Sequence, residues 1–307
     1  MENIVRTINL NKKYKFKHAL KDFNITIKKG DIYGLIGVNG AGKSTLIKII
    51  AGITQQTSGD LYLFGTRNDL DLQRRKIGAV IENPSFFPNM SAYQNLEYYA
   101  TVMATAAGPI DHETIVQLLN KVKLDPMSKQ PFRQFSLGMK QRLGIAFALL
   151  NNPEFVILDE PTNGLDPIGI LELRDIILEL NKSGVTFLIC SHILSELSQI
   201  ATKYGIVHNG RFVRELTNED LISFQQDSVI VKLENGHGKA FMDALHKWHY
   251  LYSISHGVYT VQITNGINVF LRQLVEENIE IVSITQVQTS LEDVFKATIA
   301  NGGENNV

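Results

Sequence analysis

The chain has 307 residues, which exceeds the usual size of one domain and predicts two. Hydrophobic residues make up 44% of the chain and charged residues 20%, which is typical of a globular protein and argues against general disorder. The formal net charge is -1, so no excess of basic residues calls for nucleic acid or an acidic membrane surface as a partner.

The single cysteine, Cys190, cannot form an internal disulfide, and this is typical of a reducing compartment. The sequence does not start with a basic segment followed by a long apolar stretch, so we expect no signal peptide. No apolar run approaches the roughly 20 residues that a membrane helix needs. If the protein works at a membrane, we expect another chain to cross it.

The first elements in chain order are antiparallel strands, because residues 5–30 alternate apolar and polar side chains. Residues 23–27 are the clearest case. The basic residues between Lys12 and Lys21 are interpreted as a solvated edge rather than a nucleic-acid patch. The apolar run Ile32–Ile36 predicts a buried strand, and a glycine-rich turn and a helix over residues 43–51 follow it.

Strands and helices then alternate along the chain. The pattern predicts a helix between Gly108 and Pro126, a helix over 141–150, a strand over 155–158, a helix over 168–180 and a strand over 187–190. This alternation favours a mainly parallel sheet covered by helices.

The pattern changes near Leu216. The predicted elements after it are a strand over 228–233, a helix over 239–247, strands over 251–255 and 259–263, a helix over 267–277, a strand over 281–286 and a helix over 291–299. We therefore expect one domain at residues 1–220 and a small α+β domain at residues 221–307.

The sharpest motif runs from Gly37 to Thr45, GVNGAGKST, and fits the P-loop pattern G-x-x-x-x-G-K-[ST]. Its glycines let successive backbone N–H groups face one anion, and the next helix adds unpaired donors at its N-terminus. Lys43 can reach the β- and γ-phosphates of a triphosphate, and the Ser44 hydroxyl can ligate Mg²⁺. A turn that fits by chance is the alternative, which the surrounding strand and helix disfavour. The predicted nucleotide contacts are Gly37, Asn39, Gly40, Ala41, Gly42, Lys43, Ser44 and Thr45.

Residues 155–160, FVILDE, predict a buried strand that ends in two carboxylates. Burying charge is costly unless something compensates it, and a Mg²⁺ ion does so. We expect Asp159 to hold Mg²⁺, and Glu160 to lie beside the γ-phosphate, where it would orient or deprotonate the attacking water. Without the P-loop, a strand end with solvated acids would be the better interpretation.

Further motifs resemble those of the ATP-binding-cassette (ABC) ATPases. Residues 135–142, FSLGMKQR, resemble the family signature LSGGQ, and residues 159–166, DEPTNGLD, resemble its Walker B motif and D-loop. Ser191 and His192 resemble the family's switch histidine segment, and Tyr14 matches the aromatic residue that stacks on adenine. The resemblance covers about residues 1–220.

The resemblance implies an α/β P-loop NTPase of the ABC-ATPase type, with a mixed sheet core, an antiparallel β subdomain and a helical signature subdomain. It implies ATP and Mg²⁺ as cofactors and His192 as a sensor of the γ-phosphate. It also implies a homodimer of head-to-tail cassettes, in which Ser136 and Gly138 of one copy complete the ATP site of the other. Asp166 would cross the dimer interface.

Two positions depart from the family pattern. The Q-loop glutamine is replaced by Glu82, which can still ligate Mg²⁺ but adds negative charge near the γ-phosphate; a solvated loop acid is the alternative. The lantibiotic self-protection group is similar in carrying glutamate here, which favours a variant over a defect. Leu137 and Met139 alter the signature, whereas Ser136 and Gly138 remain.

Three strings, IENP at 81–84, SLGMKQRLGIA at 136–146 and SLEDVF at 290–295, resemble the bacitracin-resistance and lantibiotic self-protection ATPases of Gram-positive bacteria. The resemblance implies an ATPase subunit at the cytoplasmic face of the cell membrane that powers export of a peptide antibiotic or related compound through a separate permease.

One alternative is a soluble ABC-type ATPase that acts on nucleic acid or ribosomes without a permease. It is disfavoured because no coiled-coil heptads separate the P-loop from the signature and the chain carries one cassette, so we expect no nucleic-acid partner. A module that binds ATP without hydrolysing it is a second alternative, disfavoured by the presence of Glu160 and His192.

Overall fold

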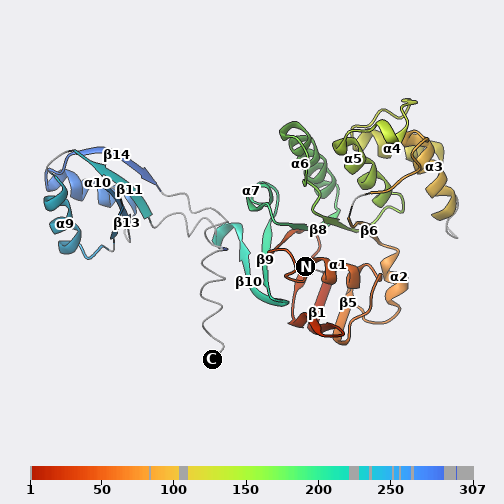
Figure 1. Ribbon diagram of the computed structural model, residues 1–307, viewed down its shortest axis with the longest axis horizontal. Coiled ribbons are helices and arrows are strands. Elements are labelled where there is room, and N and C mark those ends of the chain that lie inside the picture. Colours follow the sequence, from red (N-terminus) through yellow and green to blue (C-terminus); the bar gives the residue numbers. More distant parts are fainter. Residues whose placement is uncertain are drawn as a thin grey trace. The chain divides into compact units, whose positions relative to one another are not determined.

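The computed structural model describes residues 2–82, 84–103, 110–220, 228–234, 237–250, 252–255, 257–263, 266–286 and 295. The chain divides into two compact units, Met1–Glu215 and Leu216–Val307, and each is described by itself (Figure 1). The helix predicted over 291–299 lies outside the described residues, apart from Phe295.

A six-stranded sheet with the order β10-β9-β4-β8-β7-β6 forms the centre of the first unit. Its strands are β4 (Ile32–Ile36), β6 (Ile77–Val80), β7 (Phe155–Asp159), β8 (Thr186–Ser191), β9 (Lys203–His208) and β10 (Arg211–Thr217). The pairs β6–β7, β7–β8, β8–β4 and β4–β9 are parallel. The prediction of a mainly parallel sheet is therefore confirmed. Strands β4 and β8 are buried along their whole length and mostly apolar, as expected for strands covered on both faces.

A second, antiparallel sheet surrounds the long strand β1 (Asn3–Tyr14). Its other strands are β2 (Lys17–Phe23), β3 (Thr26–Lys28) and β5 (Ser58–Leu63), each paired with β1. The prediction of one strand over residues 23–27 is wrong, because β2 ends at Phe23 and β3 begins at Thr26. The Asn24 side chain donates to the Asp22 carbonyl and accepts from the Asn9 amide, both at 2.8 Å. These local bonds compete with a continuous strand ladder.

The helices of the first unit are α1 (Lys43–Ile50), α2 (Leu70–Arg74), α3 (Ala92–Met103), α4 (His112–Lys121), α5 (Leu137–Ala148), α6 (Pro167–Lys182) and α7 (Leu194–Leu197), with a 3-10 turn at Phe132–Gln134. Helices α3, α4 and α5 contact one another and form the helical group drawn in yellow and green in Figure 1. Helix α5 begins four residues before the predicted start, because Ser136 caps it: its Oγ accepts from the Met139 amide at 3.2 Å.

The central sheet gathers four loop segments at one edge. The strands β4, β6, β7 and β8 are parallel, so their carboxyl ends lie at the same edge of the sheet. The P-loop follows β4, Glu82 follows β6, Glu160 follows β7 and His192 follows β8. This edge of an open parallel sheet is where ligands bind.

The second unit is a small α+β fold of the β-α-β-β-α-β type. Its elements are β11 (Ser228–Leu233), α9 (Gly238–Lys247), β12 (Tyr252–Ser255), β13 (Val258–Gln262), α10 (Ile267–Glu276) and β14 (Ile281–Gln286), with the antiparallel strand order β12-β13-β11-β14. Phe241 on α9 and Phe270 on α10 are fully buried in a core with Val229 and Val231 of β11. Within the described residues, no helix is both long and apolar enough to cross a membrane.

Candidate active site

The loop between β4 and α1 is packed so tightly that two of its glycines have no room for a side chain. A Cβ added to Gly37 would lie 2.6 Å from the Val207 carbonyl oxygen, and one added to Gly42 would lie 2.7 Å from the Ala19 carbonyl oxygen. Gly40 and Gly42 also have φ values of 80° and 118°, a region that glycine favours. The glycines of the motif are therefore required by packing as well as by the curvature of the loop.

A cavity of about 290 Å³ opens over this loop. Its lining comes from β1, β2, the loop itself, the start of α1 and the end of β7: Tyr14, Lys17, Ala19, Val38, Asn39, Gly40, Ala41, Gly42, Lys43, Ser44, Thr45, Asp159 and Glu160. The structure thus brings together the predicted contacts Asn39 to Thr45, the predicted aromatic residue Tyr14 and both acids of β7. Gly37 does not line the cavity, but its carbonyl oxygen accepts a hydrogen bond from Nζ of Lys43.

Lys43 is a buried cation with two partners. Its side chain is 6% exposed, its Nζ donates to the Gly37 carbonyl at 2.6 Å, and it lies 3.7 Å from Oε1 of Glu160. A buried ammonium group needs such partners, because its desolvation is costly. The lysine is therefore held at the cavity floor, between the loop and the end of β7.

Asp159 has an unsatisfied carboxylate oxygen. Its Oδ1 is buried and has no hydrogen-bond partner among the described residues. Burial and the neighbouring charge of Glu160 raise the pKa of Asp159, while a hydrogen bond from Ser44 and the charges of Lys43 and Lys48 partly oppose the shift. A cation at this point would compensate the buried charge.

The donor set beside Asp159 fits Mg²⁺. A carboxylate oxygen and the Ser44 hydroxyl are hard oxygen ligands, and Mg²⁺ in phosphate sites commonly takes only one or two carboxylates together with substrate phosphates and water. No group of three or more His, Cys, Asp or Glu residues that could hold a metal occurs in the described part of the chain.

Glu160 and His192 are bonded to each other. The Nδ1 atom of His192 lies 2.7 Å from Oε2 of Glu160, and the His192 amide donates to the same oxygen at 3.3 Å. Glu160 has a φ of 49°, in the left-handed region, and its amide donates to the Cys190 carbonyl at 2.8 Å. Strain of this kind persists where the surrounding structure enforces it, and it clusters at functional sites.

Glu82 does not line the cavity. Its exposed carboxylate accepts a hydrogen bond from Nζ of Lys48 at 2.8 Å. Lys48 lies on α1, one turn beyond Ser44, and sequence reasoning did not single it out. Lys48 could have been found from its spacing of four residues from Ser44, because residues at that spacing share a helix face.

Ser136, Gly138 and Asp166 also lie outside the cavity lining of their own chain. Ser136 caps α5, and Asp166 caps α6 by accepting from the Gly169 amide at 2.9 Å. The two helix starts are neighbours, since a Cβ added to Gly164 would lie 3.0 Å from Cδ2 of Leu137. One chain by itself therefore does not bring the signature residues to the P-loop.

Two lysines of the β1–β2 hairpin take part in the site, although sequence reasoning interpreted their segment as a solvated edge. Lys17 lines the cavity. Lys12 lies over the Tyr14 ring, 4.8 Å from its centroid, and its Nζ donates to the Gln55 carbonyl at 2.6 Å. The ammonium group therefore covers one face of an aromatic ring that is 45% exposed.

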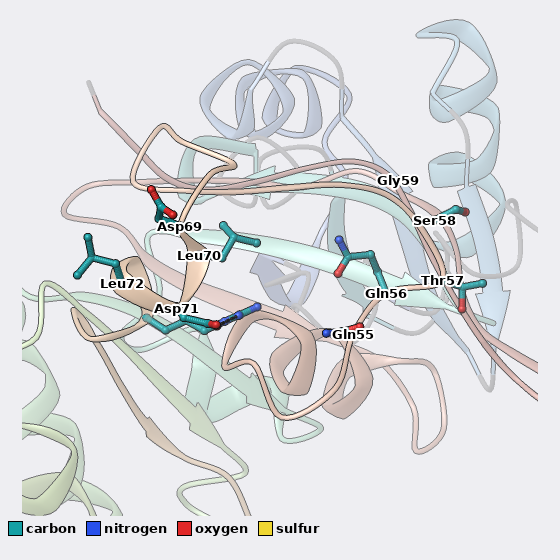
Figure 2. Close-up of a pocket in the computed structure, with 10 residues that line it drawn as sticks. Gln55, Gln56, Thr57, Ser58, Gly59, Asp69, Leu70, Asp71 and Leu72 are labelled. Carbon is teal, nitrogen blue, oxygen red and sulfur yellow. Dashed lines mark hydrogen bonds and ion pairs between the residues drawn. The ribbon is translucent and has the colours of Figure 1, made fainter.

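A larger cavity, of about 760 Å³, lies between residues 55–59 and the segment around α2 (Figure 2). It contains none of the predicted site residues. Its charged groups include Asp71 and Arg74, which pair with each other at 2.7 Å. This cavity is not part of the site.

Comparison with known proteins identifies the family. A sequence model described as ABC transporter matches residues 20–163. The bacitracin transport ATP-binding protein BcrA of Bacillus licheniformis is 38% identical over 308 residues, covering 98% of this chain and 99% of that protein. The chain belongs to the ABC transporter ATP-binding proteins. The lantibiotic transport ATP-binding protein SrtF of Streptococcus pyogenes is 48% identical over 210 residues, covering 67% of this chain and 88% of that protein.

Solved ABC cassettes share the fold. The protein cbiO1 of Clostridium perfringens, described as part of the ABC transporter complex cbiONQ, aligns with a TM-score of 0.65 and 29% identity over 73% of this chain and 92% of that one. The cassette MJ0796, described as a dimer in a post-hydrolysis state bound to ADP and Pi, aligns with a TM-score of 0.63 and 28% identity over 70% of this chain and 98% of that one. The predicted ABC-ATPase fold class is confirmed, and ATP binding and ATPase activity are properties of this family.

Proposed function

We propose that this ABC protein binds and hydrolyses ATP and so powers the export of a peptide antibiotic or related compound through a separate permease. Residues 1–220 would be the nucleotide-binding domain and residues 221–307 an accessory domain. One observation carries the proposal: the P-loop, Asp159 and Glu160 line a single cavity, and His192 is bonded to Glu160 beside it.

The P-loop residues would bind the phosphates. Asn39, Gly40, Ala41 and Gly42 supply backbone N–H groups, Lys43 adds a buried positive charge, and Ser44 and Thr45 add hydroxyls at the start of α1. Tyr14, 45% exposed, would stack on adenine. Ser44 and Asp159 would hold Mg²⁺, and Glu82, which follows β6 at the same sheet edge, would be a further ligand. The ion would neutralise charge on the β- and γ-phosphates.

Glu160 would act as the general base. It lies at the cavity end of β7, and a carboxylate there would accept a proton from the attacking water or orient that water toward the γ-phosphate. His192, now bonded to Glu160, would donate a hydrogen bond to the γ-phosphate when ATP enters. Glu160 would therefore transfer the proton, and His192 would sense the γ-phosphate.

A second copy would complete the site. Ser136 and Gly138 stand at the exposed start of α5, where a hydroxyl and unpaired backbone N–H groups can meet a γ-phosphate. Two head-to-tail copies would therefore place ATP between them, with Asp166 at the interface. Hydrolysis would remove the phosphate contact and loosen the dimer.

The transport role is supported by the two relatives named for bacitracin and lantibiotic transport, neither of which is described as acting on nucleic acid or ribosomes. The ATPase would sit at the cytoplasmic face of the cell membrane, held there by its permease. The cargo would be selected by that permease.

Two experiments test the proposal. The purified chain, with Mg²⁺, should bind ATP and release phosphate, alone or together with its membrane partner. A tagged chain should retain a multi-span membrane protein from its own cells; that protein and the chain, expressed together in a peptide-sensitive host, should raise resistance to bacitracin or a lantibiotic. The control is the same membrane protein expressed with the Lys43→Ala variant of the chain. Equal resistance from both pairs would contradict ATP-driven export.

A further inference from the structure

Glu82 and Lys48 form an ion pair beside the phosphate and metal residues of the site. Lys48 comes from the second turn of α1, and Glu82 follows β6. Their Nζ and Oε1 atoms are 2.8 Å apart, and the Glu82 side chain is 71% exposed. The backbone of Glu82 has a φ of 66°, an uncommon value for a residue other than glycine.

The charges around the cavity explain why this pair matters. Asp159 and Glu160 line the cavity that would receive a triphosphate, and Glu82 is a third carboxylate that follows β6 at the same sheet edge. Lys43 lies beside Glu160, whereas Lys48 bonds Glu82 and also acts on the charge of Asp159. Without Lys48, the Glu82 carboxylate would be an uncompensated negative charge near an anionic ligand.

The pair stays charged at neutral pH. An ammonium and a carboxylate group are both charged at neutral pH at their ordinary pKa values. Loss of the pair should change folding stability little, because exposed ion pairs contribute little to it. An effect of the pair on ligand binding can therefore be measured without a large change in folding stability.

We propose that Lys48 is a positioning residue for Glu82: it holds the glutamate in a neutral ion pair, so that a carboxylate at this position does not repel the incoming triphosphate. The proposal rests on the proposed function, because it assumes that the cavity binds ATP. It assigns Lys48 a role that depends on the identity of residue 82. A glutamine at position 82 would need no such cation.

The test is a double-mutant cycle on nucleotide affinity. The wild type, Lys48→Gln, Glu82→Gln and the double variant are titrated with a fluorescent ATP analogue, with Mg²⁺ and with EDTA, at low and moderate salt. We expect Lys48→Gln to weaken binding by about three- to tenfold when Glu82 is present, and less than about twofold when residue 82 is glutamine. The effect should shrink at higher salt and persist in EDTA, because it is repulsion of the nucleotide rather than loss of a metal ligand.

Controls separate this role from a structural one. Lys48→Arg keeps the cation and should restore affinity to within about twofold of the wild type. Lys76→Gln removes a lysine that pairs with Glu154 at 3.3 Å, at the opposite end of β6 and β7, and should leave affinity unchanged. Melting temperatures of the Lys48 variants should stay close to that of the wild type, which shows that each protein is folded.

The remaining outcomes overturn the inference. If Lys48→Gln weakens binding equally with glutamate and with glutamine at position 82, Lys48 acts on the nucleotide directly. If it weakens binding in neither case, the ion pair is a solvated surface contact with no role in nucleotide binding. An effect seen only with Mg²⁺ would make the pair part of the metal site. A wild-type chain that binds no triphosphate would instead overturn the proposed function, and this inference with it.

Discussion

The Oε2 atom of Glu160 lies 2.7 Å from Nδ1 of His192, so the two residues with proposed catalytic roles are bonded to each other across adjacent strand ends. Glu160 also lies 3.7 Å from the Lys43 ammonium group. The glutamate therefore connects the residue proposed to sense the γ-phosphate with the lysine of the P-loop. The bond to Glu160 uses Nδ1, which leaves the Nε2 atom of His192 as the ring nitrogen that would contact a phosphate.

Replacing Glu160 by glutamine should separate binding from hydrolysis. Glu160→Gln keeps the shape and a hydrogen-bonding group beside His192 but removes the proton acceptor. We expect ATP affinity within a few-fold of the wild type, and phosphate release slowed by about a hundredfold or more. Titration with a fluorescent ATP analogue and a phosphate-release assay measure the two effects. Full-rate hydrolysis by this variant would remove Glu160 from the role of base.

Replacing Lys43 by alanine should weaken nucleotide binding itself. The change removes a buried cation and leaves the Glu160 carboxylate without one of its partners. A hydrogen bond to a charged group contributes about 1.5–3 kcal/mol, so we expect affinity to fall by about ten- to a hundredfold. Lys121→Ala, in the last turn of α4, is the matched control. Unchanged affinity for Lys43→Ala would count against the phosphate-binding loop.

Tyr14 should contribute to base recognition and not to phosphate binding. Stacking of a base on an aromatic ring contributes about 1–3 kcal/mol, so Tyr14→Ala should weaken ATP binding by about five- to 150-fold, while Tyr14→Phe should not. Inorganic triphosphate should compete equally well for wild type and variant. Loss of affinity for both ligands would mean that the loop, not the ring, had been damaged.

Lys12 should contribute to ATP binding by holding the Tyr14 ring through a cation–π contact. A cation over an exposed aromatic ring contributes about 0.5–1 kcal/mol, so Lys12→Ala should weaken ATP binding by about two- to fivefold. Phe16, in the same hairpin, is fully exposed, and Phe16→Ala should have no effect on affinity. The same titration measures both variants, and equal losses would show that the hairpin had been disturbed as a whole.

Tyr204 should make the stability of the first unit depend on alkaline pH. Its ring is fully buried, its hydroxyl donates to the Ala201 carbonyl at 3.1 Å, and burial raises its pKa to about 12 from the ordinary value of 10.0. The folded protein therefore disfavours the ionised form. The stabilisation is fully present below about pH 10 and is lost as pH rises toward the folded pKa of about 12.

Tyr204→Phe isolates this effect. At pH 7 the variant should be less stable by about 1 kcal/mol, because it lacks the hydrogen bond. At pH 11 the wild type should have lost about 1 kcal/mol that the variant retains, so the difference should nearly vanish. Urea unfolding of both proteins at the two pH values measures the difference, in which the other tyrosines cancel. If the difference in free energy of unfolding is the same at pH 7 and pH 11, the raised pKa of Tyr204 is contradicted.

The chemistry of the site could be predicted from short segments, since each motif carries its own function locally. The residue types and spacing of GVNGAGKST predict a phosphate-binding loop, and FVILDE predicts a buried strand that presents two acids. The prediction was poorer for elements whose residues form weak local patterns. The elements of the first unit that were not predicted are β5, β6, β9, β10, α2, α3 and α7. The strand over residues 23–27 was wrong because Asn24 bonds its neighbours and interrupts the ladder.

The sequence by itself determined the family, the class of ligand that the family implies and the residues proposed to form the phosphate loop, because these depend on neighbours along the chain. Only the tertiary structure decided which distant residues meet. Glu160 meets His192 and Lys48 meets Glu82 across 32 and 34 positions, because parallel strands β4, β6, β7 and β8 end at one edge of the sheet. Such pairs arise from strand order and register, which no local pattern of residues contains.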